Sequence, residues 1–292
     1  MTYLTKEDWQ SNYVQKICDD KSFAEYYQEK KKIHSDFIFL IKIIFKNKNN
    51  TFPVKIIQRL LYSSLILFHK YILSNDISFF DLSLIEKLTI YSACIYLSFK
   101  VTNKLIPLNL ISSKFQPLFN GQKKIVYEIE DINNLIKNKE MEILISINFQ
   151  VNIDWPFDYF YLIENYLTQN EIKRETIKNV INFVNIKINE VILFPIYLYF
   201  TPFEILISIL SCVKEEFKLG YININDFIKI NNLNIDKNNI AECALVINKI
   251  ISQEKCLNEK NNNNISINTA IKENKEKEKV NFNVLSGIQT NI

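Results

Sequence analysis

Glycine is scarce in this chain of 292 residues, which contains only Gly121, Gly220 and Gly287. A nucleotide-binding loop needs several closely spaced glycines, because backbone N–H groups must surround the phosphates at short range. Three isolated glycines do not form such a loop. We therefore exclude the common phosphate-loop and dinucleotide-binding folds.

Histidine and cysteine, which metal sites and nucleophilic catalysis use most, are also few and dispersed. Of the two histidines, His34 and His69, the second lies in the apolar helical stretch LILFHKYI, which favours a packed side chain. Five cysteines stand singly at positions 18, 94, 212, 243 and 256, a pattern that supports neither a zinc site nor a disulfide framework. Ser-His or Cys-His catalysis therefore has few candidate residues. We expect a non-catalytic protein of a reducing compartment that requires no cofactor.

The chain also lacks a strong net charge and an uninterrupted membrane span. A formal net charge of +3 is too small to indicate direct nucleic-acid binding. The first residues do not resemble a signal peptide. The apolar run 191–213 is long enough to cross a bilayer, but Thr201, Pro202 and Glu204 form the pattern of a capped helix start within it. We expect two buried segments that meet at a turn, and no membrane partner.

Apolar residues are abundant, at 48% of the chain, and most recur with helical spacing. Helices are predicted over 6–30, 34–46, 53–73, 83–100, 107–115, 123–147, 156–168, 170–193, 201–217, 223–230 and 236–253. Small residues in YSACIYLSFK (91–100) and ILISILSCVK (205–214) mark a central helix in each of two sets, since they let neighbouring helices approach closely. The pattern predicts an all-α fold with two similar bundles.

Four segments follow from this pattern. They are an N-terminal helix (1–33), a first bundle (34–154), a second bundle (155–253) and a tail (254–292). The tail is rich in Asn, Lys and Glu, a composition that predicts a mostly disordered segment of low complexity.

Two stretches resemble the cyclin box and occur in the order found in cyclins. The first, LYSSLILFHKYILSNDISFFDLSLIEKLTIYSACIYLSFKV, contains the aromatic-basic-aromatic element 68–71 and a helix with small residues that ends at Lys100. The second, EMEILISINFQVNIDWPFDYF, has Glu140, an apolar residue four positions later, Phe nine positions later and then a proline. The resemblance covers most of 34–160 and, more weakly, 161–253. It implies two tandem cyclin-box five-helix bundles after an N-terminal helix.

The resemblance also implies a kinase-binding site. In cyclins the matching lysine and glutamate face the kinase partner and flank an apolar groove that receives a kinase helix. Lys100 and Glu140 would then be the paired charges, with Val101, Leu144 and Phe149 in or beside the groove. The simpler alternative is that Lys100 extends into solvent and that Glu140 is an ordinary helix carboxylate.

Other features bear on the type of cyclin. Thr102 and Asn103 stand where cyclins often carry two acidic residues, which affects local contacts but leaves the lysine. The Thr-Pro start at 201 and the early Trp9 resemble cyclin H most. Trp9 and Tyr13 are expected to pack the N-terminal helix on the first bundle. The sequence around Trp9 also resembles cyclin C, so cyclin C and the K, L and T types remain alternatives.

The function implied by the resemblance is that of a regulatory subunit. It would bind a cyclin-dependent kinase catalytic subunit and activate it by pushing the kinase C-helix inward. For a cyclin H type the kinase would be a CDK-activating and transcriptional kinase, with a RING-type assembly factor and transcription factor IIH as associates. The location would be the nucleus, and also the cytoplasm. The competing hypothesis is a DNA-binding factor like transcription factor IIB, which also has cyclin boxes, but the zinc ribbon usual in that factor is missing.

Overall fold

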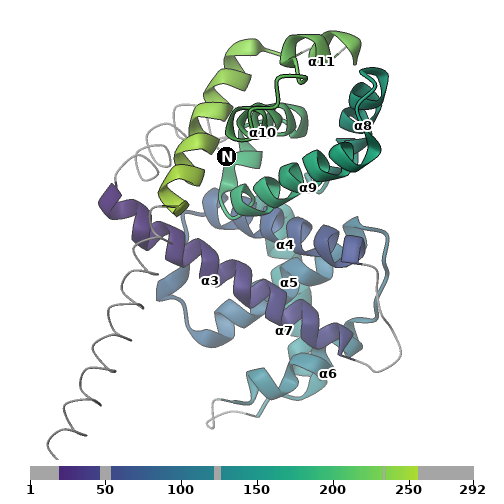
Figure 1. The fold of residues 1–292 in the computed structure, drawn as a ribbon. Coiled ribbons are helices and arrows are strands. Elements are labelled where there is room, and N and C mark those ends of the chain that lie inside the picture. The colour runs from purple at the N-terminus through teal and green to yellow at the C-terminus, as the bar shows by residue number, and fades with distance from the viewer. Residues whose placement is uncertain (1–19, 47–53, 122–125, 232, 234, 256–292) are drawn as a thin grey trace, which may run out of the picture. The chain divides into compact units, whose positions relative to one another are not determined.

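Every regular element in the described part of the chain is a helix (Figure 1). The computed structural model describes residues 20–46, 54–121, 126–231, 233 and 235–255. The predicted contacts of Trp9 and Tyr13, and the predicted tail beyond residue 255, lie outside these ranges. Within them, the prediction of an all-α fold is confirmed.

The first set of helices is arranged around α5 (Leu84–Val101). Around it pack α3 (Asp20–Phe45), α4 (Val54–Ser74), α6 (Leu108–Phe119) and α7 (Ile129–Ser146), and the short 3-10 turn η2 (Phe79–Asp81) precedes it. From Leu88 to Phe99 only Tyr96 is not fully buried, so α5 is surrounded on all sides. Ser92 and Ser98 are completely inaccessible, and their small size permits this close packing.

Local chemistry defines both ends of α5. The Ser83 hydroxyl accepts a hydrogen bond from the Glu86 backbone N–H, and the Glu86 carboxylate accepts one from the Ser83 N–H at 2.9 Å. This capping box satisfies N–H groups that have no partner within the helix. At the other end the chain turns at Asn103, which has a positive φ of 54°. Lys100 therefore lies in the last turn of a buried helix, where its ammonium group can reach the surface.

Helix α3 joins two stretches that the sequence analysis predicted as separate helices. Separate helices were expected over 6–30 and 34–46, whereas α3 is continuous from Asp20 to Phe45. Residues 30–32 are three lysines. Because lysine is a good helix former, this stretch does not end the helix. Tyr27 and Ile33 are both buried, so the apolar face continues through the basic stretch.

The second set of helices follows α7. It consists of η3 (Pro156–Tyr159), α8 (Phe160–Gln169), α9 (Arg174–Val191), η4 (Pro195–Leu198), α10 (Pro202–Glu216) and α11 (Ile224–Ile230), and residues 237–248 are also helical. The apolar run 191–213 is divided between the end of α9, the turn η4 and α10, as predicted. Thr201 and Glu204 form the predicted capping box at the start of α10. No helix in the described ranges is both long and apolar enough to span a bilayer.

Polar side chains join the two sets, which lie in one compact unit that ends at Asn248. The Gln58 amide on α4 donates a hydrogen bond to the Asn185 side chain on α9 at 3.1 Å. Asp158 of η3 forms an ion pair with Arg59 of α4. Helix α4 thus belongs to the first bundle and also contacts the second bundle.

His69 makes a further contact between α4 and the second set. Its ring nitrogen Nδ1 is hydrogen-bonded to the Tyr197 hydroxyl of η4, and the two rings stack with centroids 5.8 Å apart. The side chain is 1% exposed, which confirms the predicted packed histidine. Burial, and to a lesser extent the charge of Lys30, lowers the pKa of His69 well below its ordinary value of 6.5.

We predict that His69 makes the protein less stable in mild acid. In the folded state His69 stays neutral, whereas in the unfolded state it gains a proton below its ordinary pKa, so stability falls as the pH drops below about 6.5. The substitution His69→Phe should remove up to about 1.4 kcal/mol of this loss per pH unit. Urea unfolding of both proteins at pH 7.0 and 5.5 measures the difference. An equal loss of stability in parent and variant would contradict the prediction.

Candidate binding site at the end of the central helix

Lys100 and Glu140, forty positions apart in the chain, meet where α5 and α7 lie side by side. The Lys100 Nζ is 2.5 Å from the Glu140 Oε1, and it also lies over the Tyr96 ring, 4.3 Å from its centroid. Glu140 is 8% exposed, whereas the Lys100 side chain is 41% exposed. A carboxylate at this depth is costly unless it is paired, so the lysine stabilises it and fixes the end of α5 against α7.

An apolar row on α7 adjoins the charge pair. Leu144 is half-buried, as is Val101 at the end of α5, whereas Phe149 is 60% exposed. Met141 and Ile145, which the sequence analysis did not select, are 53% and 51% exposed. Their spacing of four residues places them on one face of α7, and Phe149 comes another four residues later, just after the helix. This spacing was the signal available in the sequence.

Phe149 is held outward by an unusual backbone turn. Asn148 and Phe149 both have positive φ angles, of 52° and 57°, which bulky side chains seldom adopt. The Phe149 N–H donates a hydrogen bond to the Leu144 carbonyl at 2.8 Å and so closes the end of α7. Glycine would suit this conformation better, so an exposed phenylalanine here is retained at a cost in stability.

Two neighbouring residues of α4 hold the C-terminal part of α7 in place. The Tyr71 hydroxyl donates a hydrogen bond to the Glu142 carboxylate, which also pairs with Lys139 at 2.6 Å. Burial raises the pKa of Glu142, but the hydrogen bonds from Lys139 and Tyr71 outweigh this effect and lower it. Lys70 donates to the Gln150 carbonyl at 3.0 Å, just beyond the turn. Both residues belong to the element 68–71 that carries the resemblance to cyclins.

Together these side chains present an oriented ion pair beside exposed apolar surface. Such a combination fixes the direction of a docked helix through the charges and gains affinity from the apolar contacts. Among the described residues, no three His, Cys, Asp or Glu side chains cluster in a way that could hold a metal ion.

Comparison with known proteins finds similarity in structure but none in sequence. No protein-family model matches the chain, and no curated protein matches it. A chain of the yeast TFIIK complex of Kin28, Ccl1 and Tfb3 superposes with a TM-score of 0.52 at 15% identity, over 83% of this chain and 94% of that one. A chain of the yeast RNA polymerase II CTD kinase complex CTDK-1 gives a TM-score of 0.57 at 16% identity, over 85% and 72%.

At these levels of identity the superpositions show the fold alone. The chain has the cyclin fold. Lys100 stands in the last turn of α5, beside Glu140 of α7. The superpositions cover more than four fifths of the chain.

We predict that Phe149→Gly does not destabilise the protein and raises its unfolding free energy by up to about 1 kcal/mol. Glycine relieves the positive φ angle, although it also gains conformational freedom in the unfolded state. Phe149→Ala is the matched control, because alanine removes the ring but keeps the strained backbone. Chemical denaturation of the three proteins compares them. A glycine variant less stable than the alanine variant would show that the positive φ angle at residue 149 costs no stability.

Proposed function

We propose that this chain is a non-catalytic regulatory subunit that binds and activates a cyclin-dependent kinase. The observation that carries the proposal is the Lys100–Glu140 pair beside the apolar row, in a chain with the cyclin fold. The proposed kinase-binding residues are Lys100, Val101, Glu140, Leu144 and Phe149, to which the exposed positions of Met141 and Ile145 add two more. Because these residues lie on two packed helices, the surface is formed before the partner arrives.

Activation follows from preferential binding to one conformation of the kinase. A kinase helix docked on α5 and α7 is held in the inward position, where the kinase can complete the ion pair that orients ATP. The cyclin needs no reacting group for this role. Its contribution is the difference in binding free energy between the active and inactive positions of that helix.

Within the cyclins we propose the CDK-activating and transcriptional type, closest to cyclin H. The TFIIK complex contains Kin28 and Tfb3 beside Ccl1, which supports a kinase partner, a third assembly subunit of RING type, association with transcription factor IIH and a nuclear location for this chain. The similarity to CTDK-1 supports the alternative, a cyclin of a kinase that acts on the RNA polymerase II tail. Affinity purification of the chain, identification of the kinase that copurifies, and assay on a kinase activation loop and a polymerase-tail peptide distinguish the two.

We predict that Lys100→Glu and Glu140→Lys each weaken kinase binding at least tenfold, about 1.4 kcal/mol. Each change reverses the charge that one member of the pair offers to the partner, so that complementary charges across the interface become like charges. Binding of the purified chain to the copurified kinase subunit, measured by calorimetry, tests this.

The double variant Lys100→Glu/Glu140→Lys separates a structural role from a binding role. It restores an internal ion pair, and thus stability, but reverses the charges that the kinase meets. We expect it to fold like the parent protein and still bind weakly. Lys137→Glu, on an exposed position of α7, is the matched control and should bind normally. If the double variant regained full affinity, the pair would serve folding alone.

A further inference from the structure

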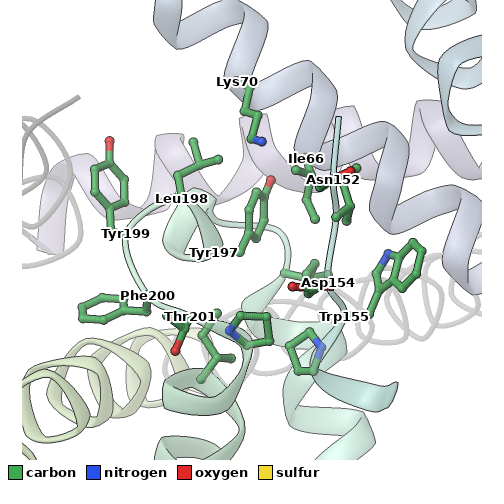
Figure 2. A pocket seen from close by; sticks show the side chains of 15 residues that line it. Ile66, Lys70, Asn152, Asp154, Trp155, Tyr197, Leu198, Tyr199, Phe200 and Thr201 are labelled. Atoms are coloured by element: carbon green, nitrogen blue, oxygen red, sulfur yellow. The ribbon is translucent and has the colours of Figure 1, made fainter. Parts of the chain in front are cut away.

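A crevice lies between α4, the segment that joins the two bundles, and the region of η4 (Figure 2). It encloses about 320 Å³, a volume that accommodates one or two large side chains. Ile66 and Lys70 line it from α4, and Tyr197 and Leu198 line it from η4. It is distinct from the proposed kinase-binding residues, none of which lines it.

One wall of the crevice is a segment of non-helical backbone. Residues 151–155 run between α7 and η3 without helical structure. Ile153 is buried while Asn152 and Asp154 are exposed, which is the alternation of a β-strand. Among the described residues, no backbone hydrogen bond involves these three positions. An extended edge of this kind can pair with the backbone of another extended chain.

The crevice also contains two charges of opposite sign that do not neutralise each other. In Figure 2, Lys70 and Asp154 extend toward Tyr197, one from α4 and the other from the joining segment. Lys70 donates to the neutral Gln150 carbonyl, and neither it nor Asp154 forms an ion pair with a described residue. Burial lowers the pKa of Lys70, so an anionic partner would favour its charged form.

We propose that this crevice binds an extended peptide segment of a partner protein that carries one acidic and one basic residue near an apolar residue. The peptide backbone pairs with residues 152–154, its acidic side chain meets Lys70, and its basic side chain meets Asp154. The apolar side chain fills the space between Ile66 and Leu198. A purely apolar ligand would leave both charges without partners, and a purely anionic one would be repelled by Asp154. The proposal does not depend on kinase binding, because a different surface is used.

The probe is a random twelve-residue peptide library displayed on phage and selected on the immobilised full chain. Peptides that also bind the double variant Lys70→Glu/Asp154→Lys are removed first. The most enriched peptide is then synthesised, and its affinity is measured by fluorescence anisotropy. We expect at least a tenfold loss of affinity for Lys70→Glu and for Asp154→Lys. A peptide with its acidic and basic residues exchanged should bind the double variant better than the parent protein.

Two controls make the result specific. Lys42→Glu, at an exposed position of α3, and Lys137→Glu, at an exposed position of α7, should bind the peptide as the parent does. Hydrogen exchange of the amides at 152–154 should slow when the peptide binds. Circular dichroism checks that each variant is folded. If Lys70→Glu disturbs the contact with the Gln150 carbonyl, Asp154→Lys still tests the site, because Asp154 is exposed. No enriched peptide, equal binding to both variants, or protection confined to other segments would overturn the proposal.

Discussion

The ion pair between Lys100 and Glu140 is the interaction on which the candidate site depends. Glu140 is 8% exposed and forms an ion pair with Lys100, which can reach it only because α5 ends beside α7. The pair therefore sets the relative position of the two helices that carry the exposed apolar row. It also leaves part of the lysine accessible, so the same interaction that orders the bundle keeps a positive charge at the surface.

Helix α4 links this site to the rest of the molecule through consecutive residues. Phe68 packs in the aromatic core against Phe79 and Tyr91, while His69 contacts the second bundle at Tyr197. The next two residues hold the end of α7. Four adjacent side chains point in different directions around a helix, so one short element positions the core, the second bundle and the docking surface together.

Much of the fold was predictable because helical signals are local. The capping boxes at Ser83 and Thr201, and the prolines that precede α4 and start α10, mark helix starts that the structure confirms. The extent of α3 was not predicted, because a run of lysines interrupts its apolar composition but not its buried face. Met141 and Ile145 were also missed. Their exposure depends on which face of α7 packs against α5, and that is a property of the bundle rather than of the local sequence.

The sequence by itself determined the all-helical fold, the capped starts of α5 and α10 and the two motif residues that meet at the site. Those properties rest on backbone hydrogen bonding and on apolar spacing over a few residues. Only the tertiary structure decided that Glu140 is buried while Phe149 is exposed. It also decided that Lys70 and Asp154 share a crevice without pairing. Burial and charge separation depend on contacts between segments far apart in the chain, and no local pattern of residues encodes those distances.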